Sequence, residues 1–339
     1  MSSVIYYGNS TGNCTNVDYL LKRYYLPVMY GAICVVGVVG NLTSLLVYVV
    51  QVRPWRSCSI IMVNLAITDL FYMLSMPFLV YYYTRGDSWM LGDFGCRFMR
   101  FGFHFNLYGS ILFLTCLAIF RYVAVVYPLK ATQLQRKRWG ITACVVVWIL
   151  AGAQMAPMLQ MISTVQNRNK TYCLDLASND PAEVWWYGWM LTALGYLLPL
   201  VVVCVCYLSI ARELSRPAPL TGNWARAKAR ARRLIVLVLT CFIVCFLPYH
   251  ILRALRIYTR RTPEVSCLLD RWVHAVYIIS RPLAVLNTVF NLALYTLAGD
   301  QFKKAFLSLF KCDQALVKLR GLVTVELISK PNTQTTSGR

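Results

Sequence analysis

The chain alternates long apolar runs with short polar segments. Seven of these runs are long enough to cross the roughly 30 Å hydrocarbon core of a bilayer as helices. They cover about 27–50, 59–83, 97–126, 139–162, 186–211, 231–257 and 272–297. Helices are the expected form, because in lipid each backbone N–H and C=O group must find its partner within its own segment. The pattern therefore predicts an all-α membrane protein built as a bundle of seven transmembrane helices.

The composition indicates lipid as the surrounding solvent. Of the 339 residues, 58% are hydrophobic and 14% are charged, and the mean hydropathy is +0.54. Soluble domains carry about 25% charged residues. The spans also contain no Ser/His pair, no paired Asp residues and no His-Glu-x-x-His spacing. We therefore expect neither an enzyme nor a bound cofactor.

The charge distribution predicts the orientation in the membrane. Lys and Arg number 34 against 13 Asp and Glu, which gives a formal net charge of +21. One side is formed by loops 51–58, 127–138 and 212–233, the residues from 300 onward, and Arg121. It holds 21 of the 34 basic residues with only four acidic ones. Cytoplasmic loops carry an excess of Lys and Arg, so this side is expected to be cytoplasmic and the N-terminus extracellular, in the plasma membrane. Membrane topology thus explains the charge without nucleic acid as a partner.

The segments outside the bundle differ in composition. Residues 1–26 are polar and Tyr-rich without the pattern of a cleaved signal peptide, so the first span is expected to act as its own signal. The bundle is expected to cover 27–300. Residues 301–311 have the apolar spacing of a short amphipathic helix on the membrane surface, and 312–339 form a cytoplasmic tail. Basic residues in 226–233 are expected to contact anionic membrane lipid or a cytoplasmic partner.

Three glycosylation acceptors agree with this orientation. Asn9, Asn13 and Asn169 each begin an Asn-x-Ser/Thr sequence on the predicted outer side. We expect all three to be accessible for glycosylation.

Cysteines on the outer side predict disulfides. Of the thirteen cysteines, Cys14, Cys96, Cys173 and Cys267 lie outside the membrane or at its outer edge. An even set of four in an oxidising compartment favours two disulfides, with three possible pairings. We favour Cys96–Cys173, which ties the third span to the neighbouring outer loop, together with Cys14–Cys267, which ties the N-terminus to the last outer loop.

Two ionisable residues within the spans are candidate functional positions, because a charge inside a membrane span is costly. Asp69 lies in the middle of the second span, with Asn41, Asn287 and Asn291 on other helices as candidate hydrogen-bond partners. It is either a structural hydrogen-bond centre or a sodium site. Arg121 stands at the cytoplasmic end of the third span. Its simplest interpretation is a structural anchor whose charged end extends to the membrane–water interface.

Short motifs occur at defined places along the seven spans. They are Gly40-Asn41, Leu65-Ala66-x-x-Asp69, Cys96, Arg121-Tyr122, Trp148, Pro157, Pro199 with Tyr207, Phe242-x-x-x-Phe246-Leu247-Pro248 and Asn291-x-x-x-Tyr295. Together they resemble the rhodopsin-like, class A G-protein-coupled receptors. Residues 103–108, 120–122, 173–176, 250–253 and 280–284 resemble the purinergic-like branch, nearest to its receptors for dicarboxylates such as 2-oxoglutarate and succinate. The resemblance implies a small extracellular ligand, with a heterotrimeric G protein and arrestin as cytoplasmic partners.

The resemblance also assigns an activation set. Its members are Asp69, Arg121, Tyr207, Phe246, Asn291 and Tyr295. Three positions depart from the family pattern: Phe120 replaces the usual acid before Arg121, Phe246 the usual Trp, and Leu292 the usual Pro. Because Lys228 is basic as well, no carboxylate is expected to restrain Arg121 in the resting state. We therefore expect basal signalling without ligand.

Cations in the outer half of the bundle predict an anionic ligand. Arg100 and His104 are spaced i, i+4 on the third span, which places both on one face. His250 and Arg253 are spaced i, i+3 on the sixth span, and Arg281 lies well inside the seventh. No matching acidic residue occurs in these spans, so we expect the balancing charge to come from the ligand.

A small dicarboxylate fits this cluster, because a guanidinium group binds a carboxylate through two parallel hydrogen bonds. Tyr30 and Tyr83 are expected to add hydroxyl donors, and His104 or His250 a proton-linked hydrogen bond. A nucleotide or a cysteinyl leukotriene is the alternative ligand. An anion transporter is the alternative class, although no internal repeat or broken helix is evident. No Lys lies in the last span, which excludes a retinal-linked pump.

Overall fold

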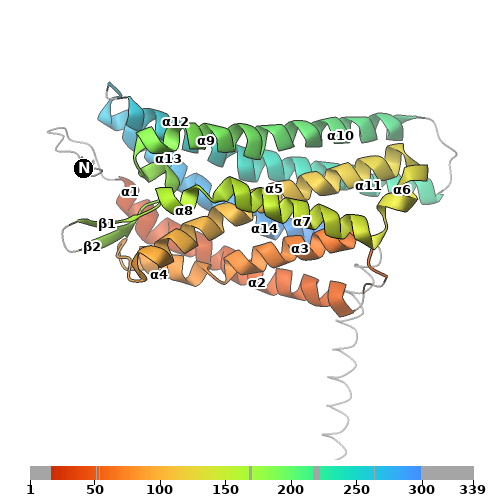
Figure 1. The fold of residues 1–339 in the computed structure, drawn as a ribbon, viewed down its shortest axis with the longest axis horizontal. Coiled ribbons are helices and arrows are strands. Elements are labelled where there is room, and N and C mark those ends of the chain that lie inside the picture. The colour runs from red at the N-terminus through yellow and green to blue at the C-terminus, as the bar shows by residue number, and fades with distance from the viewer. Residues whose placement is uncertain are drawn as a thin grey trace, which may run out of the picture.

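The computed structural model describes residues 17–50, 52, 54–167, 170–216, 222–262 and 264–298. Within these residues, seven helices are long and apolar enough to cross a membrane. They are Asp18–Val50, Ser57–Thr84, Gly92–Val126, Lys137–Met161, Pro181–Ser215, Lys228–Arg261 and Cys267–Leu297. Figure 1 shows them lying side by side as one elongated bundle. The predicted all-α membrane fold is confirmed, whereas the predicted amphipathic helix 301–311 lies outside the described residues.

The seven spans are composed of shorter helical elements. The first three spans contain α1 (Val17–Leu20), η1 (Leu21–Tyr25), α2 (Leu26–Val50), α3 (Ser57–Met73), α4 (Met76–Thr84) and α5 (Gly92–Val126). The fourth and fifth contain α7 (Lys137–Met155), α8 (Met158–Met161), α9 (Pro181–Thr192), η3 (Ala193–Leu197) and α10 (Leu198–Ser215). The last two contain α11 (Gly222–Thr240), η4 (Cys241–Phe246), α12 (Leu247–Arg261), α13 (Cys267–Val285) and α14 (Asn287–Ala298). The longest helix, α5, packs against α3, α7 and α10 and so occupies the middle of the bundle.

In three spans, a π-helical turn accommodates a proline inside the helix. The π-helical turns η1, η3 and η4 each end directly before a Leu-Pro pair that opens α2, α10 or α12. Pro27, Pro199 and Pro248 have no N–H to donate, and their rings would clash with the carbonyl four residues earlier in a regular α-helix. A wider turn at that point relieves the clash, so the helix continues.

The first span begins at Asp18, about two and a half helical turns before the predicted start at residue 27. The apolar pattern did not predict this part of the helix, because the stretch contains charged residues. Lys22 pairs with Asp87 at 3.5 Å, and the Asp18 carboxylate lies 2.6 Å from His274 Nδ1 on α13. Polar contacts with the outer ends of two other spans therefore extend the helix beyond the apolar segment.

The loop between α8 and α9, residues 162–180, folds back over the bundle and is called the outer loop after its predicted side. It contains the antiparallel pair β1 (Thr164–Asn167) and β2 (Lys170–Cys173), followed by the 3₁₀ turn η2 (Leu176–Ser178). A disulfide joins Cys173 to Cys96 on α5, as predicted. On the other side of the loop, Arg260 of α12 donates to the carbonyl oxygens of Ala177 and Asn179 at 2.9 and 2.6 Å. The loop is thus fastened at both ends over the outer mouth of the bundle.

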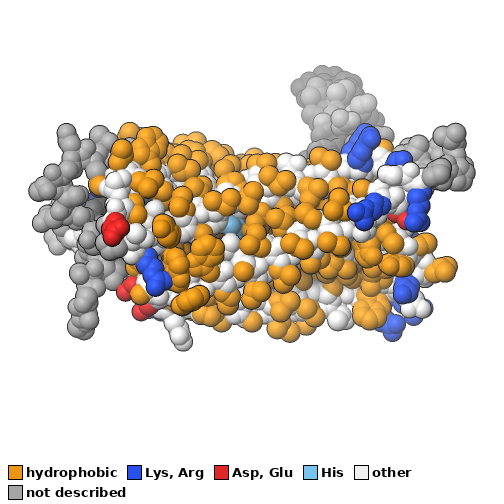
Figure 2. All heavy atoms as spheres, turned by 90° about the horizontal axis from the view of Figure 1, so that it is seen from above, with side chains coloured by type: hydrophobic (Ala, Val, Ile, Leu, Met, Phe, Trp, Pro, Cys, Tyr) orange, Lys and Arg blue, Asp and Glu red, His pale blue; other side chains and the backbone are white. Residues whose placement is uncertain are grey.

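The surface separates apolar from charged regions. Figure 2 shows a broad band of hydrophobic side chains along the bundle, with Lys and Arg gathered near the end that holds α6 (Pro128–Leu134). Apolar side chains face outward along the spans, for example Val35 at 65% and Leu198 at 55% exposure. An apolar belt bounded by charge is the surface that a bilayer solvates.

A close crossing of α3 and α7 fixes the end of the bundle that the charge distribution predicts to be cytoplasmic. The Ser57 hydroxyl lies 2.6 and 2.7 Å from the carbonyl oxygens of Leu134 and Arg136, and its N–H donates to that of Gln135 at 3.3 Å. A Cβ atom at Gly140 would lie 2.6 Å from Ser57 Cα and 2.9 Å from its carbonyl oxygen. Because both obstacles are backbone atoms, only glycine fits at this crossing.

Gly140→Ala is expected to destabilise the protein by about 1–3 kcal/mol, because the added methyl group forces two backbones apart. Thermal unfolding of the detergent-purified protein measures this as a lower Tm. Gly152→Ala on the same helix is the matched control, since nothing lies within 4 Å of its added Cβ. The control should be neutral or slightly stabilising; equal Tm values for the two variants would contradict this account of the crossing.

Candidate functional site

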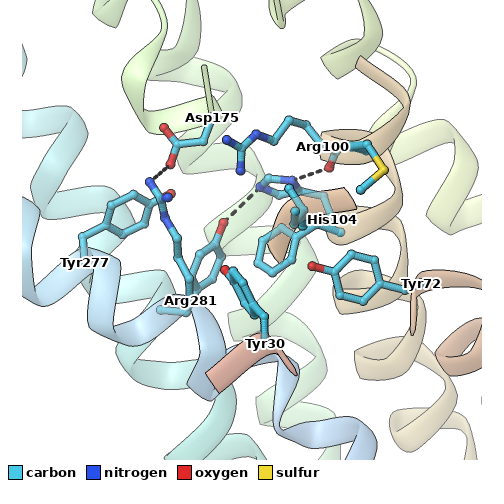
Figure 3. Close-up of a pocket in the computed structure, with 11 residues that line it drawn as sticks. Tyr30, Tyr72, Arg100, His104, Asp175, Tyr277 and Arg281 are labelled. Carbon is cyan, nitrogen blue, oxygen red and sulfur yellow. Dashed lines mark hydrogen bonds and ion pairs between the residues drawn. The ribbon is translucent and has the colours of Figure 1, made fainter. Parts of the chain in front are cut away.

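A small pocket lies beneath the outer loop, between the helices. Its lining consists of Tyr30, Tyr72, Leu79, Met99, Arg100, Phe103, His104, Asp175, Tyr249, Tyr277 and Arg281. These residues come from α2, α3, α4, α5, the outer loop, α12 and α13. Figure 3 shows the Arg281 guanidinium group directly below Asp175, with Arg100 pointing toward them from the other side. Of the predicted ligand residues, Tyr30, Arg100, His104 and Arg281 line this pocket.

Arg281 pairs with Asp175 of the outer loop. Both side chains are buried, with 6% and 5% of their surface exposed. Arg281 also donates to the Tyr83 hydroxyl at 3.3 Å, and its guanidinium carbon lies 4.7 Å from the Tyr277 ring centroid. The expectation that a ligand must supply all the balancing charge is therefore wrong. A carboxylate outside the spans, brought in by the loop, neutralises this cation.

Arg100 brings a second guanidinium group to the same pocket. Its Nη2 donates to the Cys173 carbonyl oxygen at 2.8 Å, and its buried Nε has no partner among the described residues. Burial alone would raise the pKa of Asp175, but Arg281 and Arg100 lower it below its usual range. The carboxylate is therefore ionised at neutral pH. Two buried cations share one anion here, which leaves one net positive charge.

His104 lines the pocket with both ring nitrogens already engaged. Its Nδ1 lies 3.0 Å from the Arg100 carbonyl oxygen, and its Nε2 lies 3.0 Å from the Tyr249 hydroxyl. A carbonyl can only accept, so Nδ1 carries the hydrogen, and in the neutral ring Nε2 accepts from Tyr249. In this arrangement His104 orients Tyr249 and has no free nitrogen for a proton-linked bond to a ligand.

The predicted residues Arg253 and His250 lie outside the pocket lining. Arg253 is fully buried and donates to the Tyr108 hydroxyl at 2.5 Å and to the Thr192 hydroxyl at 3.0 Å. The His250 ring stacks on Tyr196 with centroids 4.4 Å apart, and its Nδ1 lies 2.8 Å from the Phe246 carbonyl oxygen. The i, i+3 spacing correctly placed both residues within the bundle. However, the Arg253 side chain turns toward α5 and α9, and the His250 ring turns toward the π-helical turn η3.

Asp69 accepts two hydrogen bonds deeper in the bundle. Asn106 donates to one carboxylate oxygen at 3.0 Å, and Asn291 donates to the other at 2.9 Å. Asn291 was a predicted partner; Asn106 replaces the other two candidates. Asn41 instead donates to the Gly37 carbonyl oxygen at 2.9 Å. Among the residues described, no group of three or more His, Cys, Asp or Glu side chains could hold a metal ion, and a sodium ion at Asp69 stays a prediction.

The other residues of the predicted activation set lie toward the half of the bundle that is predicted to be cytoplasmic. Arg121 Nη1 and the Tyr207 hydroxyl are buried without a hydrogen-bond partner in the part of the chain that the structure describes. The Tyr295 hydroxyl donates to Asn41 Oδ1 at 3.4 Å. Phe246 is fully buried in η4, edge-on to Phe242 with ring centroids 5.5 Å apart. Among the described residues, no salt bridge joins Arg121 to a carboxylate, and the effect of Phe120 on the resting state stays a prediction.

Several outer positions lie partly or wholly outside the described chain. Cys267 forms a disulfide whose partner is not among the described residues, and Cys14 also lies outside them. The Cys14–Cys267 link therefore stays a prediction. The acceptors Asn9, Asn13 and Asn169 fall outside the described residues as well.

Sequence reasoning missed four polar members of the pocket, namely Tyr72, Asp175, Tyr249 and Tyr277. A signal existed for Asp175, which follows Cys173 by two residues. A disulfide from Cys173 to the top of the third span brings the next residues of the loop to the mouth of the bundle. The three tyrosines gave no such signal, because aromatic residues in apolar spans are common on every face.

A bundle of seven spans with an outer loop tied to the third span, and with polar centres at Asp69 and Arg121, defines a seven-helix membrane receptor. The family model described as "7 transmembrane receptor (rhodopsin family)" matches residues 40–295. The chain belongs to this family of G-protein-coupled receptors.

Two groups of relatives cover most of the chain. It is 45% identical over 312 residues to 2-oxoglutarate receptor 1 of Mus musculus, covering 92% of this chain and 91% of the relative. It is 36% identical over 302 residues to purinoceptor 1 of Gallus gallus, covering 88% and 82%. It is 37% identical over 282 residues to purinoceptor 2 of Mus musculus, covering 83% and 75%.

Asp175→Asn is expected to lower the Tm of the unliganded receptor, because it leaves Arg281 buried without an anion. Losing one partner of a buried pair costs about 3–5 kcal/mol. Arg281→Gln added to the same chain removes the unpaired cation, so the double variant should lose less stability than the sum of the two single changes. Thermal unfolding of the four purified proteins measures this coupling.

Asp180→Asn is the control for the loss of one negative charge in the same loop. Asp180 caps α9 by accepting from the Ala182 N–H at 2.9 Å, and Asn preserves this acceptor. Its Tm should stay close to that of the wild type. Strictly additive losses in the Asp175 and Arg281 variants would show that the pair is not coupled.

Proposed function

We propose that this chain is a plasma-membrane receptor for a short extracellular dicarboxylate such as 2-oxoglutarate, and that binding activates a heterotrimeric G protein inside the cell. The relatives with 45% identity are named for 2-oxoglutarate, which supports this ligand class. The two purinoceptors are more distant at 36–37% identity.

The observation that carries the proposal is the charge balance of the pocket. Arg100 and Arg281 face the cavity from α5 and α13, and Asp175 is the carboxylate among its lining residues. A second carboxylate is therefore needed to balance the two guanidinium groups. One carboxylate of a dicarboxylate supplies this balance at Arg100. Its second carboxylate competes with Asp175 for Arg281, because a guanidinium group binds any carboxylate through the same two-pronged contact.

The enclosure of the pocket favours a short acid over the alternative ligands. Its lining side chains Tyr72, Arg100 and Arg281 lie beneath the outer loop with only 1%, 8% and 6% of their surface exposed. A nucleotide or a cysteinyl leukotriene is a larger molecule and would need the loop to move. Arg253, the third predicted cation, lies beyond the lining and is already bonded to Tyr108.

The charge pattern supports the proposed orientation. The N-terminus is extracellular, and the basic end of the bundle is cytoplasmic. Figure 2 shows Lys and Arg at that end, where they can meet anionic membrane lipid, the G protein and arrestin. An anion transporter is the alternative class. Acid-dependent signalling without uptake of labelled acid into cells that express the chain separates receptor from transporter.

Arg100→Gln tests the ligand assignment. A hydrogen bond to a charged group contributes about 1.5–3 kcal/mol, so the variant should need roughly ten- to a hundredfold more 2-oxoglutarate for the same response. Calcium and cyclic-AMP responses of cells at matched surface expression measure the shift. The wild type should respond to the diacid more strongly than to its monoester, and Arg100→Gln should reduce that preference.

Arg97→Gln is the matched control on the same helix. Arg97 bonds to Asp93 at 2.5 Å and to the Leu159 carbonyl oxygen at 2.5 Å, and it does not line the pocket. Its dose–response curve should match the wild type. A wild type that responds to nucleotides or cysteinyl leukotrienes and not to dicarboxylates would refute the proposed ligand class.

Phe120→Asp is expected to lower ligand-free signalling several-fold, because it gives Arg121 a neighbouring carboxylate that favours the resting state. Turnover of G protein by the unliganded receptor, at equal surface expression, measures basal signalling. Phe120→Asn has nearly the same shape as the Asp variant without the charge and is the control. An unliganded wild type that is silent, or equal effects of Asp and Asn, would contradict the role given to this position.

A further inference from the structure

Tyr72 presents an unused hydroxyl group to the pocket. Its side chain is 1% exposed, it belongs to the lining, and its hydroxyl oxygen has no hydrogen-bond partner in the described part of the chain. Figure 3 shows the hydroxyl pointing toward the space between His104 and Tyr30. A buried hydroxyl without a partner is costly, and such groups in native proteins are usually completed by water or a ligand.

The position of the Tyr72 ring is set by its neighbours. On α3 it lies one turn from Asp69, and its ring meets Phe103 of α5 edge-on with centroids 5.8 Å apart. One turn along α5 from Phe103, Asn106 donates to Asp69 at 3.0 Å. The two helices are thus joined by two successive contacts, Tyr72–Phe103 and Asp69–Asn106. The hydroxyl is held at the pocket and cannot swing away to find another partner without breaking the first contact.

Two other tyrosine hydroxyl groups at the pocket have assigned partners. The Tyr249 hydroxyl lies 3.0 Å from His104 Nε2, and the Tyr83 hydroxyl accepts from Arg281 at 3.3 Å. The two guanidinium groups carry positive charge and therefore prefer carboxylates. Tyr72 differs from them because it is a neutral donor. A neutral hydroxyl suits an uncharged oxygen, such as a ketone or an alcohol.

We infer that Tyr72 is a specificity-determining residue, whose hydroxyl donates to an uncharged oxygen on the carbon chain of the bound dicarboxylate. This inference rests on the proposed function. With one carboxylate on Arg100 and the other on Arg281, the 2-oxo group is the remaining polar atom of 2-oxoglutarate. Tyr72 then distinguishes oxygen-substituted diacids from the unsubstituted diacid of equal length, while the arginines recognise the charge common to both.

Tyr72→Phe, which removes one oxygen atom and keeps the ring against Phe103, tests this inference. The probes are 2-oxoglutarate and glutarate, which have the same five carbons and two carboxylates. In the wild type, the concentration for half-maximal response should be roughly 5- to 30-fold lower for 2-oxoglutarate. In Tyr72→Phe the ratio should fall close to one through weaker action of 2-oxoglutarate, with the glutarate curve unchanged. Competition binding on membranes should show the same change as signalling.

Tyr187→Phe is the matched control. The Tyr187 hydroxyl donates to the Gln154 carbonyl oxygen at 2.8 Å, away from the pocket lining, so its loss should leave the ratio of the two acids as in the wild type. A ratio that persists in Tyr72→Phe overturns the inference. So does an equal loss for both acids, because it would assign Tyr72 to a carboxylate or to the fold.

The wild type alone supplies a test that does not depend on the folding of a variant. Equal responses to 2-oxoglutarate and glutarate would overturn the role of Tyr72 and leave the proposed receptor for dicarboxylates intact. A wild type that responds to neither acid would overturn the proposed function and this inference together.

Discussion

A buried carboxylate shared by two buried guanidinium groups is the interaction on which the outer half of this receptor depends. A cation in a low-dielectric bundle is costly unless an anion or several hydrogen bonds compensate it. Asp175 pairs with Arg281 directly and acts on Arg100 through space. Because one anion cannot fully balance two cations, the pocket retains a preference for a further negative charge. The pairing with Asp175 thus lowers the cost of burying the two cations without ligand, and the charge that it leaves unbalanced favours an acidic ligand.

The outer loop makes this arrangement possible. The Cys96–Cys173 disulfide fixes the end of β2 to α5, and Asp175 follows two residues later. Arg260 holds the far side of the loop through two carbonyl oxygens. The Asp175 carboxylate therefore points into the bundle from a loop that is held by α5 and α12. A ligand that replaces Asp175 at Arg281 would change the contacts of the loop with α5, α12 and α13 together. Ligand binding could then shift these three membrane-spanning helices.

Sequence patterns predicted the bundle well because each span must be long and apolar on its own. The exception is instructive: helix before residue 27 is stabilised by pairs such as Lys22–Asp87, which join segments far apart in the chain. The site was predicted in part for the same reason. Arg100, His104 and Arg281 were found because a polar residue in an apolar span is conspicuous. Asp175 was missed because its role depends on where a loop folds.

The direction of individual side chains was the second feature that the sequence could not predict. Asp69 binds Asn106 rather than Asn41, although both asparagines lie on helices beside it. Arg253 turns to Tyr108, which a helical spacing of three residues cannot reveal. Such choices follow from helix rotation and the packing of neighbouring rings, and these are properties of the assembled bundle rather than of any single span.

An experimental structure of the receptor with 2-oxoglutarate bound tests the central claim most directly. The account predicts the acid in the pocket beneath the outer loop, with one carboxylate on Arg100 and the other on Arg281. The Asp175 carboxylate would then no longer be the only anion at Arg281. An acid bound beside Arg253, or at the surface with this pocket empty and the Asp175–Arg281 pair unchanged, would contradict the account.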